Sequence, residues 1–287
     1  GSAEESFGYI MEKSLRPYRD ELFISTKAGH DMWPGPYGIH GSRKYLLASL
    51  DQSLKRMKID YVDVFYSHVY DPETPIEETM QALVDAVRMG KALYAGISKY
   101  PADKARIAYD YLAAHDVPCL LYQGRYNILN REPQTEGILS QAEQNGTGFI
   151  AFSPLAQGLL TDRYLNGIPE DSRVACGGYL KKEALTDKMM NKIRRLDEMA
   201  KRRGQSLAQM SLAWLHHNPA VTSVIIGASS VEQIANNLQT LNSPGFTEEE
   251  LRRAVAFAHL HHVRVHVTVN TLIKDREMDE VKELLRH

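Results

Sequence analysis

Cysteine is scarce in this sequence, which has only Cys119 and Cys176 among 287 residues. Two cysteines outside any CxxC or Cys/His pattern do not build the disulfide framework of a small secreted domain or a thiolate metal site. Excess charge of either sign is also missing, since the net charge is -2 and the pI is near 6.6. We therefore expect neither nucleic acid nor an anionic membrane as the main partner.

Long apolar runs are absent as well. The apolar stretches are far shorter than the roughly 20 residues that a membrane-spanning helix needs. No charged-then-apolar leader with a small-residue cleavage site is seen at the start of the sequence. We expect a soluble, cytoplasmic protein. What is present is a hydrophobic fraction of 43%, enough for the core of one large domain.

Short β-rich runs alternate with longer helical patterns, which is typical of a parallel α/β fold. The clearest helix follows Ser42, a capping residue, and its leucines recur with a 3.6-residue period. Seven strands are predicted, whereas a closed TIM barrel needs eight. The predicted strands are 22–27, 61–66, 92–97, 118–122, 148–152, 223–226 and 263–269, and the predicted helices are 3–15, 43–57, 75–89, 101–114, 134–145, 186–203, 206–217, 231–241, 247–261 and 275–286.

Chemically active side chains stand at the carboxyl ends of these strands, where a barrel of this kind places its active site. Lys27 ends the first predicted strand and His68 follows the second. A lone lysine or histidine at a strand end is more often structural, but the two on neighbouring strands favour a site. Further along the chain, the run 227–230 precedes a predicted helix, so its backbone N–H groups and hydroxyls form a candidate anion site. An ordinary helix cap is the alternative.

Several segments together resemble the aldo/keto reductase family, in that family's order and spacing, over about residues 1–255. Within the family the resemblance is closest to the branch of bacterial glyceraldehyde-3-phosphate and methylglyoxal reductases and potassium-channel β-subunits. The segments are STKAG (25–29), GSRKYLLASLDQSLKRMKIDYVDVFYSH (41–68), GKALYAGIS (90–98), FSPLAQGLLTDRY (152–164) and SVIIGASSVEQIANN (223–237).

This resemblance implies a TIM (β/α)8-type barrel that binds NADPH and reduces small aldehydes. Lys27 matches the family's catalytic lysine, which lowers the pKa of a neighbouring tyrosine, and His68 matches the histidine that orients the substrate carbonyl. The matched cofactor-binding positions are Ser98 and Gln123 at the nicotinamide carboxamide, Phe152 against the nicotinamide ring, Ser153, Leu155 and Gly158 in the strap over the pyrophosphate, Arg163 and Arg173 as positive charges, and Ser229, Gln233, Asn236 and Asn237 at the adenosine end.

Two departures from the family pattern affect these expectations. Lys99 stands where many members have asparagine beside the nicotinamide, so one carboxamide contact is in doubt. Family members also begin with two β/α units that carry the catalytic aspartate and the general-acid tyrosine, and this sequence starts after the position of that tyrosine. We therefore expect an incomplete or rearranged barrel with impaired catalysis. Tyr37, in the loop after Lys27, is considered as a substitute acid but not expected to serve as one.

Beyond about residue 255 the resemblance ends, and residues 254–287 instead resemble a β/α unit of collagenase-like peptidases. We expect residues 1–255 to form the reductase portion and 256–287 an appended unit, from a natural fusion or an engineered chimera. Its strand 263–269 is expected to pair in parallel with 223–226 or to lie beside 22–27. The histidines at 259, 261, 262 and 266 suggest a metal site, but no carboxylate or third ligand is placed nearby and none is expected.

Three hypotheses follow for the function. The first is an NADPH-dependent reductase of small aldehydes of the glyceraldehyde phosphate or methylglyoxal type. The second is a catalytically inactive NADPH-binding barrel, and the third is a recombined or engineered scaffold that only folds. A homo-oligomer is compatible with each of them.

Overall fold

The computed structural model describes residues 1–35, 37–172, 174–177, 180–250 and 266–267. Two compact units make up the chain. The N-terminal unit contains residues 1–124 and 133–150, and the C-terminal unit contains residues 125–132 and 151–287. Among the described residues, no helix has the length and apolar character needed to cross a membrane.

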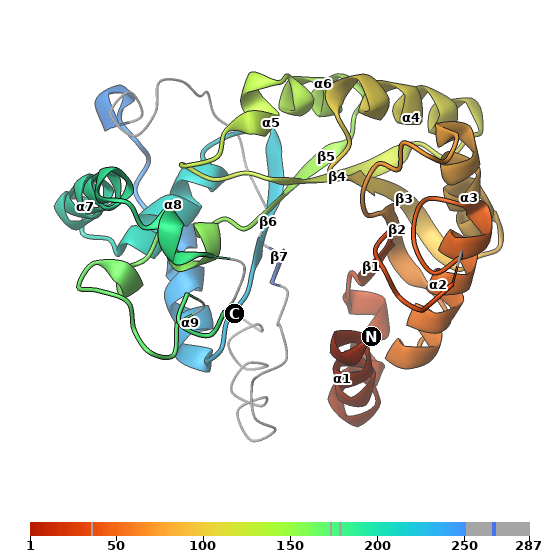
Figure 1. Cartoon of the computed structure of the whole chain (residues 1–287), viewed down its shortest axis with the longest axis horizontal. Helices are drawn as coiled ribbons and strands as arrows, with labels where there is room; N and C mark the ends of the chain where they lie inside the picture. Colours follow the sequence, from red (N-terminus) through yellow and green to blue (C-terminus); the bar gives the residue numbers. More distant parts are fainter. Residues whose placement is uncertain (36, 173, 178–179, 251–265, 268–287) are drawn as a thin grey trace. The chain divides into compact units, whose positions relative to one another are not determined.

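Four parallel strands form the sheet of the N-terminal unit, and they lie in sequence order (Figure 1). They are β1 (Ser25–Ala28), β2 (Val62–Ser67), β3 (Ala92–Ser98) and β4 (Cys119–Arg125). Lys27 is in register with Tyr66, and Ser98 with Gln123. Because the strands are parallel, their carboxyl ends meet at one edge of the sheet, where Lys27, His68, Ser98 and Gln123 lie.

Helices connect these strands and supply the rest of the core. They are α2 (Arg43–Met57), α3 (Ile76–Arg88), α4 (Ala102–Ala114) and α6 (Ile138–Gln144). The prediction for 43–57 is confirmed, and the Ser42 side chain accepts a hydrogen bond from Tyr45 N, as expected of a cap. Tyr45, Leu46 and Leu50 on the inner face of α2 are fully buried. The crossover helices thus cover the sheet with the faces that the sequence period predicts.

The chain begins with α1 (Ser2–Ile10), which continues through a π-helical turn at Met11–Leu15 and a 3-10 helix at Arg16–Glu21. The predicted helix 3–15 is therefore present but changes its winding near its middle. Gly8 in α1 is buried, and a Cβ atom there would overlap the carbonyl oxygen of Arg56 at the end of α2. Glycine at this position lets the two helix backbones approach closely.

The C-terminal unit contains α7 (Asp187–Arg202), α8 (Leu207–His216), α9 (Val231–Leu238) and short 3-10 helices at Ala156–Gly158, Asp162–Tyr164, Lys182–Ala184 and Gln239–Asn242. Its strand β6 (Val221–Ile226) pairs in parallel with β7 (His266–Val267), with Ile225 opposite His266. The predicted parallel pairing with 223–226 is confirmed for these residues. The remainder of strand 263–269 and the helix predicted at 275–286 lie outside the described residues.

Thr247 and Glu250 exchange side-chain-to-backbone hydrogen bonds, so a capping box opens the helix predicted at 247–261. That helix lies outside the described residues beyond 250. The split at residue 255, the resemblance of the final segment to a peptidase and the incomplete barrel all stay predictions.

Two predicted elements differ from the observed ones for local reasons. The predicted strand 22–27 begins only at Ser25, because the Leu22 carbonyl is bound by the Arg19 side chain and Phe23 is exposed. The predicted helix 134–145 is divided into α5 (Glu132–Thr135) and α6, since Gly137 adopts φ 77° and interrupts the helical backbone. The fifth strand, β5 (Gly148–Phe152), has the predicted bounds.

Gly8→Ala is expected to lower the free energy of unfolding by roughly 1–3 kcal/mol, because the added methyl group meets the Arg56 carbonyl oxygen and must push α1 away from α2. Denaturant unfolding followed by circular dichroism measures the change. Gly227→Ala is the control, because a Cβ atom there meets no atom within 4 Å. Equal stability of wild type and Gly8→Ala would contradict the close approach of the two helices.

Candidate active site

Lys27 and His68 lie at the carboxyl ends of neighbouring strands, as predicted. Lys27 is the third residue of β1, and His68 immediately follows β2. The His68 N–H group donates a 2.8 Å hydrogen bond to the Ala28 carbonyl oxygen, which extends the parallel pairing by one residue. Lys27 Nζ lies 5.7 Å from the centre of the Tyr66 ring. The two side chains therefore belong to the same edge of one sheet.

The loop after β1 brings a second histidine to this edge. Gly29 has φ 148°, and a Cβ atom on it would lie 3.2 Å from His68 Cβ, so a glycine permits this approach. The His30 ring contacts the His68 ring edge-on, with 4.3 Å between centroids. Tyr45, buried on α2, fixes the loop, because its hydroxyl donates to the His30 carbonyl at 2.5 Å and accepts from Gly29 N at 3.4 Å.

Lys99 completes the group from the end of β3. Its Nζ lies 3.5 Å from His30 Nε2, and its backbone N–H donates to the Gln123 carbonyl at 3.3 Å. The residue has φ 57°, a left-handed conformation that side chains rarely adopt and that is found most often at turns and functional sites. Lys27, His30, His68 and Lys99 thus form a basic cluster over three consecutive strands.

The basic cluster lowers the pKa of its own members. Burial lowers the pKa of His68 to about 3, and the positive charges of Lys99 and Lys27 act in the same direction. Burial is also the main cause that lowers the pKa of Lys27, followed by the charge of Lys99, with Glu4 opposing. The pKa of His30 is lowered by burial and by Lys99, with Asp31 opposing. His68 is therefore neutral throughout the physiological pH range and has one N–H group to donate.

Polar side chains next to the basic cluster come from β3 and β4. Ser98 and Gln123 lie opposite each other in the sheet, with 0% and 4% of their surface exposed. The Ser98 hydroxyl oxygen is buried and has no hydrogen-bond partner among the described residues. Because an unpaired buried hydroxyl is costly, this atom fits a site completed by a polar ligand group such as a carboxamide.

The predicted strap follows β5 in the C-terminal unit, where the backbone takes an unusual path. Four residues have positive φ angles, namely Ser153 at 53°, Ala156 at 46°, Gln157 at 61° and Gly158 at 100°. The Asn127 side chain donates to the Ser153 carbonyl at 2.8 Å, and the N–H of Gly158 donates to the Leu155 carbonyl at 2.8 Å. Phe152, which precedes the strap, lies 6.0 Å from the Arg125 guanidinium. Such strain is typical of ligand-binding loops.

Of the two arginines expected near the strap, the structure describes Arg163 but not Arg173. Arg163 forms an ion pair with the Asp171 carboxylate at 2.7 Å and also donates to the Asp171 carbonyl at 3.1 Å. The Asp171 carboxylate therefore offsets the positive charge of Arg163, which the family resemblance placed near the cofactor pyrophosphate. Arg173 lies outside the described residues.

At the start of α9, Ser230 caps the helix by accepting from Gln233 N. Ser229 N and Oγ both donate to Gln233 Oε1, at 2.9 and 3.2 Å, and both side chains are exposed. The Asn236 side-chain oxygen accepts from Gln209 at 3.0 Å, and Asn237 is buried. Ser229 and Gln233 are therefore accessible to a ligand at the start of the helix. Asn236 is instead hydrogen-bonded to Gln209, and Asn237 is buried within the C-terminal unit.

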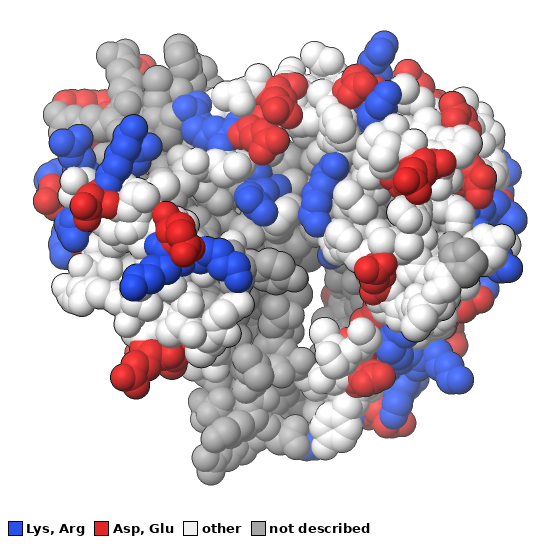
Figure 2. All heavy atoms as spheres, in the orientation of Figure 1, with Lys and Arg blue, Asp and Glu red and all other residues white. Residues whose placement is uncertain are grey.

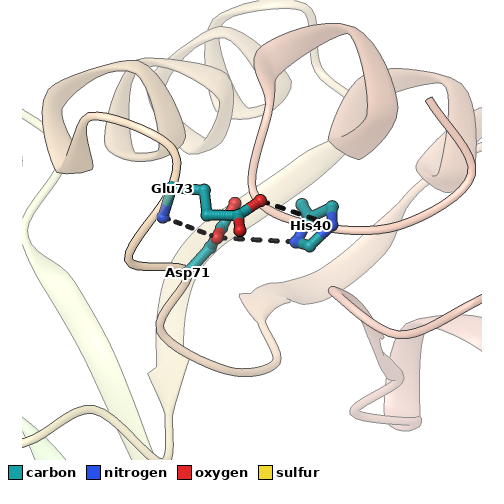
Figure 3. Close-up of side chains that lie close together, drawn as sticks. All are labelled: His40, Asp71 and Glu73. Carbon is teal, nitrogen blue, oxygen red and sulfur yellow. Dashed lines mark hydrogen bonds and ion pairs between the residues drawn. The ribbon is translucent and has the colours of Figure 1, made fainter. Parts of the chain in front are cut away.

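A separate acidic group ties the loop after β1 to the loop after β2. His40 lies 3.5 Å from Asp71 and 3.9 Å from Glu73 (Figure 3). The Asp71 carboxylate also accepts hydrogen bonds from Gly41 N, Glu73 N and the Thr74 hydroxyl. His40, Asp71 and Glu73 have side chains that can bind a metal ion. The Asp71 carboxylate oxygens, however, already accept hydrogen bonds from these protein donors. We interpret His40, Asp71 and Glu73 as a structural contact that holds the two loops together, and we call this contact the loop clasp.

Tyr37 lies in the loop that this clasp holds. Its ring is 49% exposed and lies beneath Lys44 Nζ, 4.2 Å from the ring centre. This contact places Tyr37 against the first turn of α2, and the expectation that Tyr37 does not act as the general acid stays a prediction.

Comparisons with known proteins identify the family to which the chain belongs. Residues 1–258 match the model of the aldo/keto reductase family. The chain is 55% identical to L-glyceraldehyde 3-phosphate reductase of Escherichia coli over 255 residues, which cover 88% of this chain and 74% of the relative. The chain belongs to the aldo/keto reductase family, and membership implies a TIM barrel.

More distant relatives carry a different description. The chain is 38% identical to a probable voltage-gated potassium channel subunit beta of Oryza sativa and 37% identical to its counterpart in Arabidopsis thaliana. Each match covers 84% of this chain and 74% of the relative. The predicted family and its predicted branch are therefore confirmed, with both descriptions present among the relatives.

Sequence reasoning missed His30 and Tyr45. His30 directly follows the STKAG segment, so its nearness to Lys27 in sequence was a signal that could have found it. Tyr45 gave no such signal, because it occupies an ordinary buried position of an amphipathic helix.

The lowered pKa of His68 predicts a pH-dependent stability. In the unfolded chain this histidine takes up a proton near pH 6.5, whereas in the folded chain it does so near pH 3. The unfolded state therefore binds more protons between these values, and the folded state loses stability as pH falls through that window. His68→Gln removes the effect, so wild type should lose more unfolding free energy than the variant between pH 7 and pH 5. Parallel losses in the two proteins would contradict a neutral His68.

Proposed function

We propose that this protein reduces small aldehydes with NADPH, of the glyceraldehyde phosphate or methylglyoxal type. The observation that carries the proposal is the pairing of Lys27 and His68 at the ends of β1 and β2, where burial and the positive charge of Lys99 lower both pKa values. Perturbed titratable groups at the carboxyl edge of a parallel sheet are typical of active sites. The high identity to an aldehyde-phosphate reductase supports the same chemistry.

In this proposal the neutral His68 ring orients the substrate by donating its N–H group to the carbonyl oxygen. As hydride reaches the carbonyl carbon, negative charge develops on that oxygen, and the nearby lysine ammonium groups stabilise it. Lys27 holds a proton at Nζ less tightly than an exposed lysine does, because its surroundings disfavour the charged form. A lysine of this kind is suited to support proton donation at the developing alkoxide.

NADPH, when bound, would supply the hydride. The residues proposed to hold it are Ser98 and Gln123 for the carboxamide, and the unpaired Ser98 hydroxyl supports this assignment. Phe152 is proposed to lie against the nicotinamide ring, and the strap with Arg163 and Arg173 against the pyrophosphate. Ser229 and Gln233, aided by Asn236 and Asn237, are proposed for the adenosine end, where hydroxyl and amide donors at a helix start favour a 2′-phosphate. NADPH should therefore bind more tightly than NADH.

A second candidate is NADPH binding with little turnover. Burial raises the pKa of five described tyrosines, including Tyr66 beside Lys27. A phenol with a raised pKa is a poor general acid, and loss of a general acid costs on the order of 10²–10⁴ in rate. This candidate predicts saturable NADPH binding with low turnover. The potassium-channel relatives show that this family is not limited to proteins described as reductases.

Fluorescence titration with NADPH and with NADH, alongside NADPH oxidation with methylglyoxal and glyceraldehyde 3-phosphate, tests both candidates. Saturable NADPH binding with turnover supports the reductase, and binding without turnover supports the second candidate. Failure to bind either cofactor would contradict both.

Lys27→Met should lower kcat/KM for either aldehyde by on the order of 10²–10⁴ if Lys27 supports proton donation. Binding of NADPH should change far less, because the proposed carboxamide and adenosine contacts are elsewhere. Lys91→Met is the matched control, since Lys91 lies just before the amino end of β3 and pairs with Asp51. Turnover that is insensitive to Lys27→Met would show that the site is misassigned.

A further inference from the structure

The basic cluster contains two residues, Lys99 and His30, that the carbonyl chemistry does not require. Lys27 and His68 suffice to hold and polarise a carbonyl oxygen, yet Lys99 and His30 stand next to them with only 3.5 Å between Lys99 Nζ and His30 Nε2. Both of these side chains are exposed, unlike Lys27 and His68. Because the two side chains lie within hydrogen-bond distance of each other, an anionic group that reaches one of them also lies near the other.

Two acidic side chains also act on the basic cluster. Glu4 influences Lys27, but its carboxylate accepts from Arg56 Nε at 2.7 Å and from the Thr26 hydroxyl at 2.6 Å. Asp31, exposed in the loop after β1, raises the pKa of His30 but less than burial and Lys99 lower it.

On the face drawn in Figure 2, basic and acidic side chains are interspersed. With a net charge of -2 for the whole chain, attraction for an anion must come from a local group.

The backbone also holds Lys99 in place. Its left-handed conformation follows directly on Ser98, and its N–H group is bound by the Gln123 carbonyl. Tyr45 likewise fixes the backbone of His30 through the His30 carbonyl and Gly29 N. Both members of the pair therefore project from constrained positions, which lowers the entropy lost when they bind a ligand.

We propose that Lys99 and His30 form an anion-binding pair that recognises the phosphate group of the aldehyde substrate, so that Lys99 is a specificity-determining residue. Lys99 donates from its ammonium group and His30 from its ring, while Lys27 and His68 face the carbonyl end. The proposal rests on the proposed reductase function for its substrate, but the pair itself predicts phosphate binding whether or not turnover occurs. The asparagine usual in the family would be uncharged at this position.

The selectivity between a charged and a neutral substrate tests the proposal. For Lys99→Met, the ratio of kcat/KM for glyceraldehyde 3-phosphate to that for glyceraldehyde should fall on the order of 10- to 100-fold, as expected for loss of one charge-assisted hydrogen bond. Lys99→Arg should retain most of the ratio because it keeps the charge. Lys91→Met makes the same charge change at the other end of β3 and should leave the ratio unchanged. A ratio unaffected by Lys99→Met, or lowered equally by Lys91→Met, would overturn the proposal.

A binding measurement keeps the test separate from catalysis. Glycerol 3-phosphate cannot be reduced, and its phosphate beside His30 should raise the pKa of that ring, as followed by ¹H NMR of the histidine signals, with His30→Gln used for assignment. The rise should disappear in Lys99→Met and persist in Lys91→Met. If no aldehyde is reduced but this pattern is seen, the reductase function fails and the anion pair stands. If glycerol 3-phosphate leaves His30 unchanged in the wild-type protein, the anion pair is wrong.

Discussion

The parallel register of β1, β2 and β3 is the constraint on which the site depends. Each strand contributes one basic residue at or just after its carboxyl end, namely Lys27, His68 and Lys99. The hydrogen bond from His68 N to the Ala28 carbonyl fixes how far the first two residues are offset along the sheet. A slip of one residue would turn every side chain of the slipped strand to the opposite face of the sheet and separate the group.

Once these residues are brought together, burial and repulsion decide their protonation. His68 becomes a neutral donor, and the pKa of Lys27 falls below that of an exposed lysine. This arrangement requires the loop after β1 to lie close to His68. Gly29, the hydrogen bond from Tyr45 and the contact of His40 with Asp71 hold the loop there. The same charges that perturb the pKa values are the source that we propose for affinity towards an anionic substrate.

Much of the fold could be predicted because local signals agreed with the tertiary structure. Ser42 and the leucine period fixed α2, and strand-end polarity found Lys27 and His68. The break at Gly137 and the late start of β1 could not be predicted, since each depends on backbone conformation or on a side chain from elsewhere. Neither the contact of His30 with His68 nor the bond from Tyr45 is encoded in sequence spacing. The pairing of Arg163 with Asp171 likewise needed the structure.

The central claim is that the edge formed by β1, β2 and β3 supports hydride transfer to an aldehyde, and deuterium transfer tests it most directly. The full chain is incubated with glyceraldehyde 3-phosphate and NADPH that carries deuterium at both C4 positions of the nicotinamide. Mass spectrometry then measures the product alcohol. The account predicts one deuterium on the former aldehyde carbon, even at low turnover, and its loss in Lys27→Met. Product without deuterium, or labelling that persists unchanged in Lys27→Met, would contradict the account.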